Sequence, residues 1–437
     1  MSEQPAEARL KIDFAADNQR VRKRLTLGDK TVEVSRAIRR QSEDLAADWD
    51  RGYLQGEPIV PSVRPGQRIN TAELFCGSGG LGLGVREACH ELGFRYSSLA
   101  CLDHDPEAVN VYAANHGSPL RSTCSATEIV DYTVVGQGET ARFLYPPELI
   151  DEGWQELTGD IDVLMAGPPC QGHSNLNNRS RRIDKRNQLY LTVPAVATAL
   201  GARAVVIENV QAVIHDRSEV IGTTIALLQE AGYQVETGVV SAVNSGWPQT
   251  RKRFFLIARR PGAPLDLTEV GQAVGQAPRS LEWAIGDLEN VSTTDALHQS
   301  VDLSDENRRR IDFLFDNDLH DLPNSERPAC HQDGTTYRAV YGRMKLDAPA
   351  PTITTGFLTP GRGRYIHPTQ RRTLTPREAA RIQGFPDTYT FTVNPKHPVS
   401  KAKLTKWIGD AVPMPLGYFA GLSALAPLLG MDPEDVR

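Results

Sequence analysis

The chain has 437 residues, of which 40% are apolar and 23% are charged, with a formal net charge of -6. This length and composition exclude a peptide-scale fold, a disulfide-stapled fold and a mostly disordered chain, and they favour two domains or one large domain with an added lobe. Because the net charge provides no general attraction to nucleic acid, a DNA partner would need a locally basic surface.

Export and membrane signals are missing from the sequence pattern. The start, MSEQPAEARLKIDF, has no apolar stretch, and no run reaches the roughly 20 apolar residues of a membrane span. The six cysteines form no CxxC pair and no Cys/His cluster with metal-ligand spacing. We therefore expect a cytoplasmic protein with reduced thiols, no metal site and no membrane partner.

Residues 1–66 are expected to be an N-terminal extension and linker. They contain a basic cluster between Arg20 and Arg24, a helix-like stretch near Thr31 to Tyr53 and a Pro/Gly-rich end.

Six short apolar runs separated by helix-length segments follow, and they predict an α/β fold with a parallel, doubly wound, Rossmann-like sheet. The runs are 69–75, 97–102, 161–167, 204–210, 233–243 and 253–258. After Arg260 the sequence becomes irregular and rich in Pro and Gly. We therefore expect a main domain of residues 67–260 and 405–437, and a smaller, irregular domain of residues 261–404.

The first predicted strand leads directly into a glycine-rich turn. Gly77, Gly79 and Gly82 fit the pattern G-x-G-x-x-G, which lets a backbone turn tightly against a nucleotide at a helix N-terminus. Asp103 ends the second strand, where a carboxylate can accept hydrogen bonds from ribose hydroxyls. The pattern indicates an adenosine-type cofactor without distinguishing a nicotinamide dinucleotide from S-adenosylmethionine, and a tight turn in a nucleotide-free protein is the structural alternative.

Reactive side chains follow three later strands. Cys170 comes after two prolines that stiffen the loop, and Glu208 directly follows the apolar run AVVI. A thiol has a pKa of about 8.5, so a nucleophilic Cys170 needs positive neighbours. Arg251 and Arg253 point to one face of an extended segment and could converge on an anion or a carbonyl. The structural alternatives are a small buried thiol, a capping or ion-paired carboxylate and a solvated charge run.

Together these motifs resemble the DNA (cytosine-5)-methyltransferases over roughly residues 68–425. The matching segments are Phe75–Gly80, Pro168–Gln171, Glu208–Val210, Gln249–Arg253 and Arg372–Asp387, in the family order. The resemblance implies a methyltransferase that uses S-adenosylmethionine and flips a cytosine out of duplex DNA. It implies Cys170 as the nucleophile that attacks C6, Glu208 as the proton donor at N3, and Arg253, with Arg251, at the O2 carbonyl.

The same resemblance assigns binding residues. Cofactor contacts fall on Phe75, Gly77, Ser78, Gly79, Gly80, Leu81, Asp103, His104, Pro169, Leu189 and Asp410. DNA contacts are expected from Gln171, Ser174, Arg179, Arg181, Arg182, Gln249, Arg362, Arg364 and Arg372. We expect target recognition between Arg260 and about Arg343, a monomer, and a role in bacterial restriction-modification or phage defence.

Three departures from the family pattern leave alternatives open. Asp410 stands where the family has asparagine, His173 stands where phenylalanine is usual, and Ser125 stands where an aspartate often contacts adenine. The alternatives are a tRNA cytosine-5 methyltransferase on the same scaffold, a catalytically silent DNA-binding homologue and a nicotinamide-dependent oxidoreductase. The last rests on the glycine pattern alone.

Overall fold

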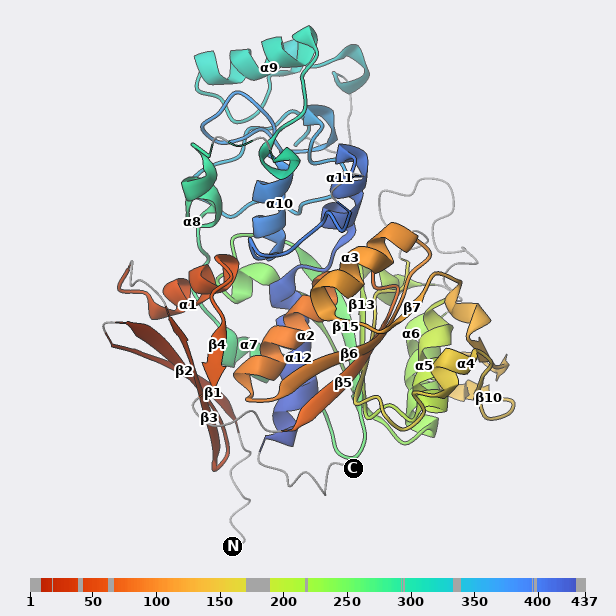
Figure 1. Ribbon diagram of the computed structural model, residues 1–437. Coiled ribbons are helices and arrows are strands. Elements are labelled where there is room, and N and C mark those ends of the chain that lie inside the picture. The colour runs from red at the N-terminus through yellow and green to blue at the C-terminus, as the bar shows by residue number, and fades with distance from the viewer. Residues whose placement is uncertain are drawn as a thin grey trace, which may run out of the picture.

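A seven-stranded sheet forms the centre of the protein (Figure 1). The computed structural model describes residues 9–17, 19–37, 42–61, 67–169, 189–216, 219–291, 293, 295–332, 339–394, 396 and 399–429. The sheet order is β14 (Gln234–Ser241), β15 (Lys252–Arg259), β13 (Ala204–Asn209), β12 (Val163–Ala166), β5 (Arg68–Leu74), β6 (Arg95–Leu102) and β7 (Leu120–Ser122).

Helices cover both faces of this sheet, which gives the expected three-layer α/β architecture. One face carries α2 (Gly80–Glu91), α3 (Pro106–His116), α7 (Leu267–Val274) and α12 (Met414–Leu425), and the other carries α5 (Leu189–Leu200) and α6 (Val220–Glu230). Alternation along the strands explains the two cores: in β12, Val163 and Met165 join the first core while Leu164 and Ala166 join the second.

The sheet is mixed, not wholly parallel as its apolar runs suggested. β15 is antiparallel to both β13 and β14. Only residues 242–251 connect β14 to β15, and this length is too short for a helical crossover between parallel strands. The reversal matters for function because β15 starts, and β13 ends, at the same edge.

Several short elements lie on the side of the main domain near α5 and α6. They are the paired strands β8 (Val130–Asp131) with β11 (Glu148–Leu149), the paired strands β9 (Val134–Val135) with β10 (Arg142–Phe143), and the helix α4 (Glu152–Gln155).

The N-terminal segment is folded, although the sequence pattern predicted an extension with a helix-like stretch. Strands β1 (Leu10–Ala16), β2 (Arg20–Leu27), β3 (Lys30–Ala37) and β4 (Ile59–Pro61) form an antiparallel sheet, and only α1 (Leu45–Leu54) is helical. The helical interpretation was wrong for 30–37, because these residues pair with β2 on one side and with β4 on the other as an inner strand of this sheet. We call residues 9–61 the N-terminal unit.

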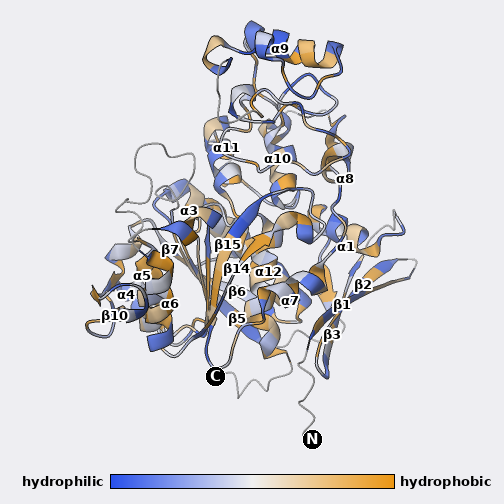
Figure 2. Ribbon diagram, turned by 180° about the vertical axis from the view of Figure 1, so that it is seen from behind, coloured by the Kyte–Doolittle hydropathy of each residue, from blue (hydrophilic) through white to orange (hydrophobic). Residues whose placement is uncertain are grey.

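A small lobe lies above the sheet in Figure 1. It comprises the described residues between 279 and 410 and contains α8 (Leu281–Ile285), α9 (Asp305–Asp316), α10 (Pro376–Gln383) and α11 (Lys401–Asp410). Much of it is irregular, and around α9 it has its own apolar cluster that includes Ile311, Leu314 and Ile366. Figure 2 shows that α9 is hydrophilic on part of its surface.

Closely packed glycines join the first and last helices of the main domain. A Cβ on Gly84 of α2 would lie 2.3 Å from the carbonyl oxygen of Met414, and one on Gly417 of α12 would lie 2.7 Å from that of Leu81. Only glycine therefore allows the two backbones to approach this closely. Residues 401–428 have the length and apolar composition of a membrane span, but they are almost entirely buried, as expected of core helices.

Candidate active site

The glycine-rich turn lies where β5 ends and α2 begins. Gly77 and Gly79 have φ angles of 49° and 91°, which favour glycine, and Phe75 also adopts a positive φ of 54°. A Cβ on Gly80 would lie 2.3 Å from the carbonyl oxygen of Val412, whereas one on Gly77 would face open space. The turn is therefore closely packed at Gly80 and open at Gly77, where a ligand can approach.

Asp103 holds this turn in place from the end of β6. Its carboxylate accepts hydrogen bonds from the backbone N–H of Gly77 at 2.9 Å and of Asp105 at 3.0 Å. His104 lies next to it with 81% of its side chain exposed and its Nδ1 3.1 Å from Asp103. An exposed ring, a carboxylate and an open glycine turn suit the adenosine part of S-adenosylmethionine.

The remaining expected cofactor residues differ in exposure. Ser78 and Leu81 are buried, and Ser78 donates a hydrogen bond to the carbonyl of Trp407, so these two can offer a ligand only their backbone. Pro169 and Leu189 are half-buried. Asp410 ends α11, and its half-exposed carboxylate pairs with Lys406 at 3.1 Å. These cofactor assignments stay predictions.

Glu208 is the next-to-last residue of β13 and lies near the glycine-rich turn and the end of β12. A Cβ on Gly167 would lie 3.8 Å from a Glu208 carboxylate oxygen and 3.9 Å from the carbonyl oxygen of Phe75. The other Glu208 oxygen pairs with Arg253 Nε at 2.8 Å. Burial raises the pKa of Glu208, while the positive charges of Arg253 and Arg251 partly offset this rise.

The two arginines do not act as an equivalent pair. Arg253 contacts the Glu208 carboxylate directly. The Nη1 of Arg251 donates to the carbonyls of Ile353 at 2.7 Å and Gly409 at 3.0 Å, and its side chain is buried. Arg251 therefore ties the start of β15 to the small lobe and contributes its charge to Glu208 from there.

Cys170 lies outside the described residues, but the structure describes the segment that leads to it. Pro168 is buried next to the end of β13, and its carbonyl accepts a hydrogen bond from Asn209 Nδ2 at 3.4 Å. Sequence reasoning assigned Asn209 no role of its own. Its position directly after a strand-ending glutamate, at the edge where the prolines follow β12, was the available signal.

The expected DNA contacts fall into four groups. Gln171, Ser174, Arg179, Arg181 and Arg182 lie outside the described residues. Arg362 is exposed on the small lobe. Gln249 was expected to touch DNA, but it is completely buried, and its Nε2 donates to the carbonyl of Ile382 and to Gln383 Oε1, both at 2.9 Å. We therefore withdraw the expectation for Gln249, which joins the small lobe to the main domain.

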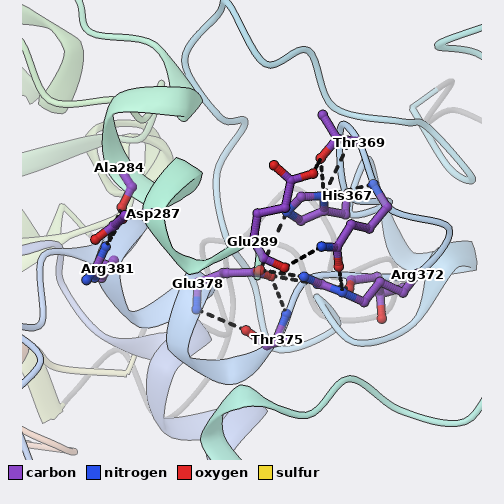
Figure 3. Close-up of polar contacts among 11 residues, drawn as sticks. Ala284, Asp287, Glu289, His367, Thr369, Arg372, Thr375, Glu378 and Arg381 are labelled. Atoms are coloured by element: carbon purple, nitrogen blue, oxygen red, sulfur yellow. Dashed lines mark hydrogen bonds and ion pairs between the residues drawn. The ribbon is translucent and has the colours of Figure 1, made fainter. Parts of the chain in front are cut away.

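Arg364 and Arg372 are engaged within the small lobe. Arg372 makes two hydrogen bonds to the Glu378 carboxylate, at 2.7 and 2.8 Å, and Figure 3 shows His367 and Thr375 around the same carboxylate. Arg364 pairs with Asp321 and donates to the carbonyl of His320. Both side chains are only partly exposed, so any phosphate contact would have to share them with these partners.

Comparisons with known proteins identify the family. The family model of the C-5 cytosine-specific DNA methylases matches residues 69–423. The chain is 40% identical over 389 residues to the Type II methyltransferase M1.BsuMI of Bacillus subtilis (strain 168), covering 88% of this chain and 87% of that relative. It is 31% identical over 356 residues to the Type II methylase M.HgiDII of Herpetosiphon aurantiacus, covering 79% and 92%.

A solved structure supports the fold independently. The Schizosaccharomyces pombe Dnmt2 methyltransferase superposes with a TM-score of 0.55 at 18% identity, over 83% of this chain and 99% of that chain. These findings confirm the resemblance, the fold class and the S-adenosylmethionine cofactor expected from the sequence. The chain belongs to the C-5 cytosine-specific DNA methylases and is a DNA (cytosine-5)-methyltransferase.

Proposed function

We propose that the protein methylates C5 of a cytosine flipped out of a short duplex site, through a temporary covalent bond between Cys170 and C6 of the ring. The observation that supports this most is the position of Glu208, whose carboxylate lies beside Gly167, three residues before Cys170, and near the carbonyl of Phe75 in the cofactor turn. A pyrimidine bound beside Glu208 would therefore lie close to the cofactor turn.

The Cys170 thiolate adds to C6, and the electron pair of the C5–C6 double bond moves to C5, which bonds to the methyl carbon as the C–S bond of the sulfonium breaks. S-adenosylmethionine supplies that methyl group. A base then removes the C5 proton, and the pair left behind reforms the double bond as the thiolate leaves C6.

Glu208 and Arg253 stabilise the charge that addition pushes into the ring. A carboxyl with a raised pKa retains its proton nearer to neutral pH and can donate it to N3. We propose that Arg253, which pairs with Glu208 at 2.8 Å, donates to the O2 carbonyl. Flipping costs a few kcal/mol, which contacts with the opened duplex offset.

The biological role follows from the relatives. M1.BsuMI is named a Type II methyltransferase and M.HgiDII a Type II methylase, so we propose a modification enzyme of a restriction or phage-defence system. We propose that it acts as a monomer in the cytoplasm.

The test is transfer of tritiated methyl groups to cytosine-containing duplex DNA, with bisulfite sequencing to identify the modified sites. Cys170→Ala is expected to abolish transfer and leave cofactor binding intact. The exposed Cys330 provides a matched control, because Cys330→Ala removes a thiol from the small lobe and should retain activity. Glu208→Gln should lower the rate at least about 100-fold, since general acid catalysis contributes 10²–10⁴-fold.

Near wild-type transfer by Cys170→Ala would refute the covalent mechanism. Unmodified DNA alongside methylated tRNA would show that the substrate is RNA. Cofactor binding without transfer to either nucleic acid would indicate a silent homologue.

A further inference from the structure

The N-terminal unit lies outside the matched family region, which begins at residue 69, yet it contacts both parts of the enzyme. We infer that this unit is a brace that sets the position of the small lobe over the main domain, with Asp50, Arg51 and Tyr53 as positioning residues for DNA binding. The inference rests on the proposed function, because it assumes that DNA binds between the small lobe and the main domain.

The unit is anchored on the main domain by buried ion pairs. Arg36 of β3 pairs with Glu87 of α2 at 2.7 Å, and Lys23 of β2 pairs with Glu91 at 2.6 Å. Trp49 of α1 donates from its indole N–H to the same Glu91 at 2.8 Å. All five side chains are buried, so each charge would be left unpaired inside the protein if the unit moved away.

The next turn of α1 holds the small lobe. Asp50 pairs with Arg279 at 2.6 Å, directly before α8, and Arg51 donates to the carbonyl of Trp283 at 2.7 Å. The guanidinium groups of Arg51 and Arg279 also lie over the Trp283 ring, at 5.2 and 4.8 Å from its centroid. Figure 1 shows α1 between the N-terminal sheet and α8.

A second set of contacts reaches the end of α10. The hydroxyl of Tyr53 donates to the carbonyl of Gly384 at 2.9 Å, and the carbonyl of Leu54 accepts from the N–H of Asp387 at 2.7 Å. Arg381 pairs with Asp387 at 2.6 Å. The same guanidinium pairs with Asp287 and donates to the carbonyl of Ala284 (Figure 3). Helix α1 is thus tied to α8 and α10 at once, which leaves the lobe little freedom to rotate on this side.

The cofactor turn is connected to the same region. The hydroxyl of Tyr389 donates to the carbonyl of Ser78. The Cβ that Gly56 lacks would lie 2.4 Å from the Thr388 side chain. Residues 387–389 therefore contact the N-terminal unit on one side and the glycine-rich turn on the other.

Two arginines on the outer face of the N-terminal sheet are already paired: Arg22 with Asp17 and Arg24 with Glu33, both at 2.8 Å. Neutralised, exposed pairs offer little attraction to phosphates. The inner edge, at α1, is where the unit meets the rest of the enzyme.

The test compares Asp50→Ala with Asp17→Ala, which breaks an exposed ion pair at the turn between β1 and β2 of the same N-terminal unit. For Asp50→Ala we expect the KM for duplex DNA to rise about tenfold, equivalent to about 1.4 kcal/mol, while kcat and the Kd for S-adenosylmethionine change less than about twofold. Arg51→Met, which keeps the apolar stem over Trp283, should show the same pattern. Exchanging the pair, as Asp50→Arg with Arg279→Asp, should restore much of the lost affinity.

The inference fails if Asp50→Ala raises the KM no more than Asp17→Ala, or if KM, kcat and cofactor affinity all worsen in step with a lower melting temperature. Small-angle scattering of the unliganded variants separates this result from failure of the proposed function. A loosened lobe increases the maximum dimension of Asp50→Ala whether or not the protein methylates DNA, and an unchanged dimension overturns the brace.

Discussion

Glu73, in strand β5 next to the middle strand β12, provides a test of the buried interior beneath the cofactor turn. Its side chain is buried, with one carboxylate oxygen 2.7 Å from where a Cβ on Gly82 would lie. Burial raises the pKa of Glu73 from 4.5 to about 8, although hydrogen bonds from Tyr112 and from the N–H of Gly82 oppose the rise. The carboxyl is therefore largely protonated at neutral pH.

The magnitude follows from linkage. A rise from 4.5 to about 8 corresponds, at about 1.36 kcal/mol per pH unit, to about 5 kcal/mol of unfolding free energy. Because the folded-state pKa is raised, this stability is fully present below pH 4.5 and is lost as the pH rises through about 8. With an unfolding entropy of about 2.1 cal/mol/K per residue, 5 kcal/mol corresponds to a melting temperature lower by about 5 °C.

The assay is thermal unfolding of wild type and Glu73→Gln between pH 5 and pH 9. The amide has the same shape and cannot ionise, so the variant should lose this part of the pH dependence and melt above wild type at pH 9. Glu148→Gln, on an exposed strand, is the matched control and should follow wild type. Parallel curves for wild type and Glu73→Gln across the whole range would refute the argument.

Three further predictions concern the site. Gly80→Ala should destabilise the protein by roughly 1–3 kcal/mol in chemical denaturation, because the new methyl group would meet the carbonyl of Val412; an unchanged midpoint would contradict the tight packing. Asp103→Ala should weaken S-adenosylmethionine binding at least about tenfold in calorimetry with little loss of fold, since it releases the Gly77 N–H. The kcat/KM profile should fall on the alkaline side as Glu208 loses its proton, at a pH above the ordinary glutamate range; Glu208→Gln should lack that limb, and a variant that keeps it would assign the limb to another group.

Much of the fold could be predicted from the sequence, because hydrophobic periodicity and turn-forming residues are local features of the chain. The six apolar runs and the turn at Gly77 and Gly79 report which segments are buried and where the backbone needs a positive φ. The reversed direction of β15 could not be predicted from the sequence, because an apolar run does not indicate which neighbouring strand it pairs with. The N-terminal sheet was missed because charged Lys23 and Arg36 occupy interior positions, where their partners come from α2.

For the site, the sequence predicted residue types better than their partners. The placement of Glu208 at the end of β13 followed from the strand pattern, and its contact with Arg253 required the reversed strand. Gln249 shows the limit: a polar residue near a reactive motif suggested a surface contact, yet long-range packing against Ile382 buries it. Such tertiary contacts leave no local signal.

The glycine contact between α2 and α12 has a consequence for synthesis on the ribosome. Helix α2 emerges early, but the helix that packs against it ends only at Leu425. One face of the nascent domain must therefore stay open while more than three hundred further residues are translated. A chain that stalls before Met414 would leave that apolar face uncovered, and its fate would depend on chaperones or proteases.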